Sequence, residues 1–311
     1  MQRLTSLLNI RYPIIQGGMA WVATAPLAAA VSEAGGLGII GAGNASPQWV
    51  REEIRRVRAL TDQPFGVNVL LMSPEAEAVI GVVAAERVPV VTTGAGSPGI
   101  YMATLKDAGC KVIPVVASVA MARRVERQGA DAIVAEGSEA GGHIGEVGTI
   151  VLLPQIVDAV SIPVIAAGGI ADGRGMAAAF VLGAEGAQLG TRFICADECE
   201  AHINYKRAIV DASERDTVVC GLSIGRPVRT LKNNLTRELA ALEKNGASYS
   251  DLSVLGSGRL RLAFAEGDMD NGSVMAGQSA ALIKDIRPAA EIIASLLAEA
   301  EKILGRRIWT N

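Results

Sequence analysis

Short apolar segments recur along the chain at an even pace. Most of them are nearly continuous runs of valine, isoleucine and alanine rather than alternations of apolar and polar residues. Such runs are typical of strands that are buried on both faces of a parallel sheet. The eight predicted strands cover residues 13–16, 37–41, 65–71, 89–93, 111–118, 130–136, 162–167 and 185–190.

The segments between these strands have the patterns of helices. Residues 49–60 are charged and amphipathic, residues 118–128 carry several arginines, and residues 175–182 are small and apolar. Two of these helices end at a glycine, Gly129 and Gly183, just before the next strand, as helices commonly do. Eight strand–helix units favour a closed α/β barrel, the (β/α)8 or TIM barrel, over an open sheet.

The rhythm changes after the eighth strand. Residues from about 195 to 265 are more polar, and the segments AHINYKRAIVDASERD and VRTLKNNLTRELAALEK both look helical. A glycine-rich stretch follows at 267–277, and an amphipathic helix at about 288–304 would be the eighth barrel helix. We therefore expect a barrel of residues 1–195 plus 266–311. A small, mostly helical insertion of residues 196–265 would cover the barrel mouth.

Composition narrows the class of protein. The chain has 311 residues, half of them apolar, only 4% aromatic, with 35 glycines and a net charge of -3. Acidic and basic residues are mixed, so neither nucleic acid nor a membrane surface is indicated as a partner. No apolar run approaches the roughly 20 residues of a bilayer span, and no cleavable signal begins the chain. We expect a soluble, cytoplasmic protein.

The four cysteines do not indicate a metal site. Cys195 and Cys199 are four residues apart, but no neighbouring His or Cys completes a ligand set. Cys110 and Cys220 stand alone in the sequence. We expect four reduced thiols and no bound metal at these residues.

Two glycine motifs follow the last two predicted strands. The first, AAGGIADG, contains Gly168 and Gly169, and the second, QLGTR, contains Gly190 and Thr191. In this barrel class the phosphate site commonly lies at these two strand ends. Backbone N–H groups near glycine and a helix N-terminus can bind a dianion, and the hydroxyl of Thr191 adds a donor. The pair of motifs predicts a phosphate-bearing cofactor.

Three other features are candidates for a site on the same rim. The motif QGGMA follows the first strand, where paired glycines either let a flat ligand approach or simply form a tight turn. Asn68 interrupts an apolar strand and needs a partner, either a cofactor edge or a buried protein group. His143 lies in a glycine-rich loop after the sixth strand. It can donate a proton or a hydrogen bond to a developing oxyanion, or simply bind a loop carbonyl. His202 is expected at the surface.

Taken together, the motifs resemble a known family. They are GGMAWVA, GGLGIIGAGNA, PFGVN, EGSEAGGHIG, PVIAAGGIADG, QLGTRF and DMDNGSVMAGQ. They look like the FMN-dependent enoyl-acyl-carrier-protein reductases of the second type, within the nitronate monooxygenase-like superfamily. The resemblance runs through residues 1–195 and about 266–285. It is thinner between 196 and 265, apart from VRTLKNNLTRE.

The resemblance implies an oxidoreductase that acts on a CH–CH bond in the last step of fatty acid elongation. NADH or NADPH would reduce FMN, and the reduced flavin would reduce a trans-2-enoyl thioester that an acyl carrier protein delivers. His143 matches the catalytic histidine of the family, which would polarise the thioester carbonyl or supply the proton. A homodimer is also implied. No arginine is clearly placed to select the 2′-phosphate of NADPH.

The resemblance also implies roles in cofactor binding. Gly18, Met19 and Ala20 would line the flavin ring through their backbone, Asn68 would reach the flavin or ribityl chain, and Glu136 would bind ribityl hydroxyls. The residues implied to hold the phosphate or close the pocket are Gly168, Gly169, Gln188, Gly190, Thr191, Met275 and Gln278. In some relatives the glycine-rich segment carries a monovalent cation on backbone carbonyls, so such a cation is a candidate here.

Basic residues concentrate in the predicted insertion. They are Lys206, Arg207, Arg226, Arg229, Lys232 and Arg237. Because acyl carrier proteins are strongly acidic, some of these side chains are candidates for the docking surface. A solvated helical face explains them equally well.

Three alternative functions stay open at this point. A nitronate monooxygenase would share the fold, FMN and His143, but would use the histidine to remove an α-proton and would need no nicotinamide. An isomerase on a phosphate-binding barrel would contain no flavin. A flavin-storing or sensing protein would bind FMN without turnover.

Overall fold

The computed structural model of the protein describes residues 2–307, and it is built on a parallel eight-stranded sheet. The strands are β1 (Ile14–Gln16), β2 (Gly38–Gly41), β3 (Phe65–Leu70), β4 (Val90–Gly94), β5 (Lys111–Val116), β6 (Ile133–Glu136), β8 (Val164–Ala167) and β9 (Gly186–Leu189). Their order is β1-β9-β8-β6-β5-β4-β3-β2. A parallel bridge between Ile15 and Leu37 joins β1 to β2 and closes the ring. The predicted strands and the TIM barrel are confirmed.

The interior of the barrel is apolar at its centre and polar at one end. Buried side chains of alternate strand residues form one cluster, including Ile15, Ile39, Ile113, Val134 and Ile165. Helix α1 (Gln2–Leu8) contributes Leu4 and Leu8 to the same cluster. One pleat further along their strands, Glu136 and Gln188 point the same way as Val134 and Gly186, because side chains alternate along a strand. Polar groups therefore meet at the carboxyl ends of the strands.

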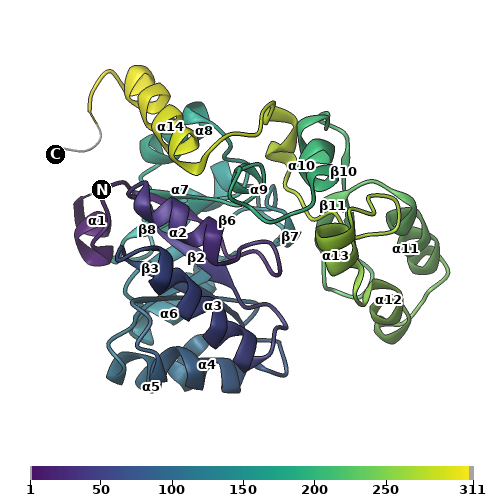
Figure 1. Ribbon diagram of the computed structural model, residues 1–311, viewed down its shortest axis with the longest axis horizontal. Helices are drawn as coiled ribbons and strands as arrows, with labels where there is room; N and C mark the ends of the chain where they lie inside the picture. The colour runs from purple at the N-terminus through teal and green to yellow at the C-terminus, as the bar shows by residue number, and fades with distance from the viewer. Residues whose placement is uncertain (1, 308–311) are drawn as a thin grey trace.

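Helices cover the outside of the barrel (Figure 1). They are α2 (Ala25–Glu33), α3 (Pro47–Leu60), α4 (Ala76–Ala85), α5 (Met102–Asp107), α6 (Val119–Arg127), α7 (Thr149–Val157), α8 (Gly173–Val181) and α14 (Ala289–Leu304), with a 3-10 turn, η1 (Pro98–Tyr101), before α5. Helix α14 packs against both α8 and α2, so it fills the eighth position, as predicted. Residues 1 and 308–311, which the sequence assigns to the barrel, lie outside the described residues.

The segment after β9 extends to one side of the barrel (Figure 1). It contains α9 (Thr191–Ile194), α10 (Ile203–Val210), β10 (Thr217–Cys220), β11 (Val228–Leu231), α11 (Asn234–Lys244), α12 (Tyr249–Gly256), α13 (Arg259–Arg261) and a π-helical turn, η2 (Leu262–Glu266). We call residues 196–265 the insertion. The chain then returns to the barrel through an extended glycine-rich stretch and a 3-10 turn, η3 (Gln278–Leu282).

One part of the predicted helical insertion is wrong. Residues 228–231 form strand β11, which pairs antiparallel with β10, and the helix begins only at Asn234. The reason is a capping box, in which the side chain of Asn233 accepts from the backbone N–H of Thr236 and the hydroxyl of Thr236 accepts from that of Asn233. Val228 and Thr230, upstream of this cap, are β-branched and suit a strand.

The insertion is tied to the barrel through a short strand. Strand β7 (Gly142–His143) lies in the loop after β6 and pairs with β11, with Val228 opposite His143 and Arg229 opposite Gly142. The predicted catalytic histidine therefore belongs to a three-stranded antiparallel sheet, β10-β11-β7, shared by the barrel and the insertion.

Between residues 2 and 307, no helix combines the length and the apolarity that a membrane span requires.

Candidate flavin site

A cavity of about 860 Å³ opens at the carboxyl ends of the barrel strands, between the barrel and the insertion. Ten of the predicted site residues line it: Gly18, Met19, Ala20, Asn68, Glu136, His143, Gln188, Gly190, Thr191 and Met275. Three do not: Gly168, Gly169 and Gln278. The volume is typical of a site for a small molecule or cofactor.

Gly168 and Gly169 lie just behind the wall, at the end of β8, in a conformation that only glycine adopts easily. Their φ angles are +94° and +73°. A Cβ on Gly168 would come within 2.9 Å of both the carbonyl oxygen of Gly137 and the hydroxyl oxygen of Thr149. A backbone with this freedom and this close packing is the kind that binds a phosphate through its N–H groups.

Thr191 completes this end of the site. It follows Gly190 at the end of β9, and its hydroxyl oxygen accepts a hydrogen bond of 2.9 Å from the backbone N–H of Gly277. Because the hydroxyl accepts from Gly277, its own hydrogen remains available to donate toward the cavity. The glycine backbone and this hydroxyl fit a phosphate group.

The loop after β1 approaches β3 so closely that only glycine fits between them. A Cβ on Gly18 would lie 2.2 Å from the Cβ of Asn68. The hydroxyl of Thr92 donates to the amide oxygen of Asn68 at 2.9 Å, which fixes the orientation of this side chain. Among residues 2–307 the amide nitrogen of Asn68 has no acceptor, so it can donate to a bound ring or ribityl chain.

Glu136 is the acidic side chain of the cavity. It ends β6, and its carboxylate has no hydrogen-bond partner within the part of the chain that the structure describes. Burial raises the pKa of Glu136 to about 7. A buried carboxyl group without a protein donor fits a ligand that brings hydroxyl donors, such as a ribityl chain.

Removing the charge of Glu136 should stabilise the flavin-free protein only at high pH. Its folded pKa lies above that of an unfolded glutamate, so its protonated form favours folding at low pH, and stability is lost as the pH rises through about 7. We expect Glu136→Gln to increase the free energy of unfolding by about 3 kcal/mol at pH 8 and by almost nothing at pH 4.5. Urea denaturation at both pH values measures this. An equal change at both would contradict it.

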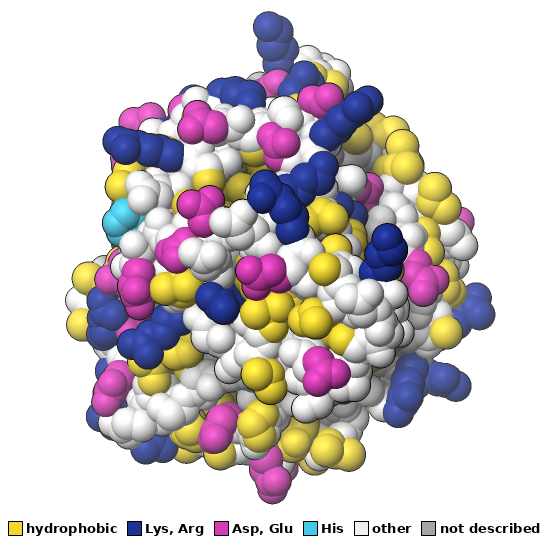
Figure 2. All heavy atoms as spheres, turned by 90° about the vertical axis from the view of Figure 1, so that its right-hand side faces the viewer, with side chains coloured by type: hydrophobic (Ala, Val, Ile, Leu, Met, Phe, Trp, Pro, Cys, Tyr) yellow, Lys and Arg dark blue, Asp and Glu magenta, His cyan; other side chains and the backbone are white. Residues whose placement is uncertain are grey.

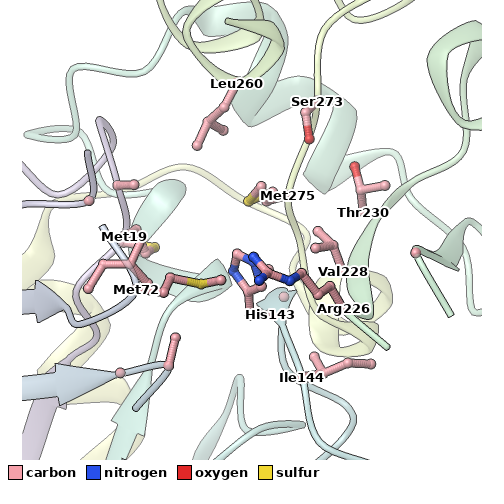
Figure 3. Close-up of a pocket in the computed structure, with 18 of the residues that line it drawn as sticks. Met19, Met72, His143, Ile144, Arg226, Val228, Thr230, Leu260, Ser273 and Met275 are labelled. Atoms are coloured by element: carbon pink, nitrogen blue, oxygen red, sulfur yellow. The ribbon is translucent and has the colours of Figure 1, made fainter. Parts of the chain in front are cut away.

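His143 projects from β7 into the cavity, with Arg226 directed toward its imidazole (Figure 3). The side chain is exposed to the cavity. Partial desolvation by the cavity walls, and secondly the positive charge of Arg226, lowers the pKa of His143 below the ordinary value of 6.5. The imidazole is therefore neutral at pH 7, with one N–H to donate and one nitrogen to accept.

A network behind His143 holds its loop. The backbone N–H and the hydroxyl of Thr149 donate to the carboxylate of Glu139, at 2.9–3.0 Å. The guanidinium of Arg229 donates twice to the carbonyl oxygen of Ser138, at 3.0 and 3.1 Å. Both ends of the loop that contains His143 are thus fixed by charged side chains.

Two of the six basic residues suggested for carrier docking are buried, so that suggestion is wrong for them. Arg229 is occupied by Ser138, and the ammonium of Lys206 donates to the carbonyl oxygen of Ala196 at 2.7 Å. Arg207, Arg226, Lys232 and Arg237 are exposed. Figure 2 shows the side of the molecule on which the insertion lies, and its basic side chains are interspersed with acidic ones.

Replacing Arg229 should destabilise the fold. Arg229→Met leaves the carbonyl oxygen of Ser138 without its donors, so we expect the free energy of unfolding to fall by about 2 kcal/mol. The matched control Arg237→Met, on the exposed face of α11, should change it by less than about 0.5 kcal/mol. Urea denaturation of both variants at pH 7 makes the comparison, and equal losses would contradict the role given to Arg229.

Two aromatic residues of the cavity were not predicted from the sequence. Tyr205 is fully buried beside the cavity and donates its hydroxyl to the carbonyl oxygen of Met275 at 2.8 Å. Trp21 lines the cavity in a left-handed conformation, with φ 65°. Only 4% of the residues are aromatic, and this scarcity was the sequence signal that could have drawn attention to Tyr205 and Trp21. His202 lies away from the cavity, where its Nδ1 accepts from the backbone of Asn204 and caps α10.

Known proteins have sequences and structures similar to those of this chain. The family model "Nitronate monooxygenase" matches residues 1–80 and 76–299. A "Probable nitronate monooxygenase" of Staphylococcus aureus (strain MSSA476) is 38% identical, over 97% of this chain and 98% of that protein. FabK from Thermotoga maritima is 53% identical with a TM-score of 0.95, over 97% of each chain. Nitroalkane oxidase from Streptomyces ansochromogenes is 34% identical with a TM-score of 0.86, over 97% of this chain and 99% of that one.

FabK is an enoyl-acyl-carrier-protein reductase of the second type, so this match confirms the resemblance predicted from the motifs. The family match covers nearly the whole chain, from the first strand to α14. On the fold, the cavity and these similarities, the chain belongs to the nitronate monooxygenase family.

Proposed function

We propose that the protein is an FMN-dependent enoyl-acyl-carrier-protein reductase that uses NAD(P)H. The observation that carries the proposal is the position of His143, which strand β7 holds in the wall of a cavity that also contains Gly190 and Thr191, two of the residues that fit a phosphate. The likeness to FabK selects the enoyl reductase within the family. FMN, when bound, carries a hydride from NAD(P)H to the β-carbon of the enoyl thioester.

The residues that would hold FMN follow from the shape of the site. The backbone at Gly168, Gly169 and Gly190 would bind the phosphate together with the hydroxyl of Thr191. Glu136 would accept hydrogen bonds from the ribityl chain. The residues that would surround the ring or close the pocket are Gly18, Met19, Ala20, Asn68, Gln188 and Met275. Gln278, outside the cavity wall, would act through the preceding glycine-rich stretch, whose Gly277 reaches Thr191.

His143 stabilises the charge that develops on the substrate. When the β-carbon of the thioester gains a hydride, negative charge accumulates on the carbonyl oxygen, and a preorganised donor there lowers the barrier. The depressed pKa of His143 keeps its imidazole neutral at pH 7, so it offers an N–H donor rather than a full positive charge. This favours polarisation of the carbonyl over transfer of a proton from an imidazolium.

Transient kinetics without oxygen test the function directly. The purified flavoprotein is reduced with NADH and then mixed with crotonyl-CoA, while the absorbance of the flavin is followed. Rapid reoxidation by the enoyl thioester supports the reductase. Failure of the thioester to reoxidise the flavin refutes it, and reaction of the oxidised enzyme with a nitronate would then support the monooxygenase. Protein that purifies without flavin would refute both.

The remaining proposals concern the partners. We infer that the substrate arrives on an acyl carrier protein, with the exposed Arg207, Lys232 and Arg237 as candidate contacts. Charge reversal at these three residues should raise the KM for carrier-bound substrate and leave that for crotonyl-CoA unchanged.

We also infer a homodimer and a monovalent cation on the glycine-rich stretch. Light scattering and replacement of potassium by choline, respectively, test these two.

A further inference from the structure

Two arginines line the cavity, and neither has a carboxylate partner. Arg226 lies in the loop between β10 and β11, and Arg261 ends α13. Both are exposed. Within residues 2–307, no acidic side chain lies within salt-bridge distance of either one, and the other charged residue of the wall is Glu136. The cavity therefore has two unneutralised cations at its wall.

Each of these arginines lies over an aromatic ring. The guanidinium carbon of Arg226 is 4.3 Å from the ring centre of Tyr249, and its Nη1 donates to the hydroxyl of Tyr249 at 3.2 Å. The guanidinium carbon of Arg261 is 5.8 Å from the ring centre of Trp21. An aromatic ring orients a guanidinium and restricts its rotamers, yet leaves most of its N–H groups free. The cations are thus held ready for an anionic ligand.

Trp21 is held in place at some cost. Its φ of 65° lies in the left-handed region, which for a bulky residue costs about 1–3 kcal/mol. The ring packs against Trp49, with 6.0 Å between ring centres. Strain of this kind persists where the surrounding structure enforces it, and it concentrates at ligand sites. Here the strained residue lines the cavity and supports Arg261.

We propose that Arg226 and Arg261 bind the phosphate ester groups of the substrates. The inference rests on the proposed function, under which both substrates contain such groups: the diphosphate of NAD(P)H and the phosphopantetheine of the thioester. The cradle at Gly168 and Thr191 consists of backbone and a hydroxyl, and no arginine contacts it in the described residues. The two exposed arginines of the cavity wall are separate from this cradle, so they suit ligands that enter and leave.

The position of Arg226 supports this assignment. Figure 3 shows its guanidinium beside the imidazole of His143. Arg261 follows Leu260, which Figure 3 places across the cavity from His143. A substrate with its reacting end at His143 can extend across the cavity, with its charged tail toward Arg261. Guanidinium groups bind phosphate oxygens in pairs, which fixes the orientation of the ligand.

The experiment compares substrates with and without phosphate in each half-reaction. The variants are Arg226→Gln, Arg261→Gln and the double variant. The control is Arg215→Gln, an exposed arginine of the insertion that does not line the cavity. Anaerobic stopped-flow follows reduction of the holoenzyme by NADPH, NADH or 1-benzyl-1,4-dihydronicotinamide, which has no phosphate. It then follows reoxidation by crotonyl-CoA or by the crotonyl thioester of N-acetylcysteamine, which also has none.

The phosphate-bearing substrates should lose about ten- to a hundredfold in second-order rate constant in the variants, as expected for charge-assisted hydrogen bonds. In Arg261→Gln the phosphate-free analogues should change less than about twofold, and the control should match the wild type. In Arg226→Gln the phosphate-free analogues should lose less than the phosphate-bearing ones, because the guanidinium also lies beside His143. A selective loss with the dinucleotides assigns the site to the nicotinamide substrate, and one with crotonyl-CoA to the thioester. Equal losses with phosphate-free analogues, or no loss in either half-reaction, would overturn the proposal.

Equilibrium binding gives a readout that does not depend on turnover. The oxidised holoenzyme is titrated with NADP⁺ and with coenzyme A in a calorimeter. For at least one of these two ligands, the dissociation constant should be about ten- to a hundredfold higher in the variants than in the wild type. If both ligands bind the double variant as tightly as they bind the wild type, the proposal fails. Its failure is distinct from that of the proposed function, which depends on reoxidation of the wild-type flavin by the thioesters.

Discussion

His143→Ala should slow reoxidation of the reduced flavin by crotonyl-CoA by about 10²–10⁴-fold, the range that a positioned donor contributes. The imidazole is held in β7, opposite Val228, and its lowered pKa keeps it neutral at pH 7. Alanine removes the donor without disturbing the backbone pairing. Reduction by NADH should change only a few-fold, because the thioester carbonyl takes no part in it. Single-turnover absorbance measurements resolve the two half-reactions.

The chain offers a matched control for this variant. His202 lies outside the cavity and caps α10, so His202→Ala should leave both half-reactions within about twofold of the wild type. The wild-type rate of reoxidation should stay level between pH 7 and 8, since His143 titrates below 6.5. If His143→Ala slowed reduction and reoxidation equally, the effect would be on flavin binding, and the role assigned to the imidazole would be wrong.

Gly168→Ala should yield protein that purifies with little or no flavin. The new methyl group would meet the carbonyl oxygen of Gly137 and the hydroxyl oxygen of Thr149 at 2.9 Å, in a backbone with φ +94°. Relief of that contact shifts the backbone that would bind the phosphate. We expect the affinity for FMN to fall at least about a hundredfold, as when several charge-assisted hydrogen bonds are lost together. Absorbance ratios and titration of the flavin-free protein measure this.

The control is another glycine-to-alanine change with no steric consequence. Gly81 lies within α4, and a Cβ there has nothing within 4 Å. Gly81→Ala should retain FMN and gain roughly 0.5–1 kcal/mol of stability, because alanine favours the helix. A Gly168→Ala protein with full flavin content would show that the end of β8 does not carry the phosphate.

The barrel could be predicted from sequence because its signals are local. A strand buried on both faces is mostly apolar, and the segments from Ile14 to Leu189 show this at eight regular intervals. The proposed phosphate site rests on a similarly local signal, the glycine pair Gly168 and Gly169, whose backbone conformations other residues resist. His143 could be singled out because the sequence contains only two histidines.

Other parts of the site depend on contacts that no local pattern encodes. Strand β11 merges into the helical pattern of α11, and only the pairing with β10 and β7 separates them. Arg229 is buried against the carbonyl group of Ser138, 91 residues away, and Lys206 against that of Ala196, 10 residues away. No local pattern reveals these contacts, so both side chains appeared to be surface cations. The convergence of Arg226 and Arg261 on one cavity likewise requires the tertiary fold.

The pairing of β7 with β11 has a consequence for building hybrid enzymes. An insertion transplanted from a relative would bring its own β11, and the partner of that strand in the recipient is the backbone of His143 itself. A graft that shifts the register by one residue would turn the side chains of the strand to the opposite face, so Val228 and Arg229 would exchange places. Chimaeras should therefore keep the present register of the two strands, with Val228 opposite His143. Otherwise a change intended for substrate preference would misplace His143.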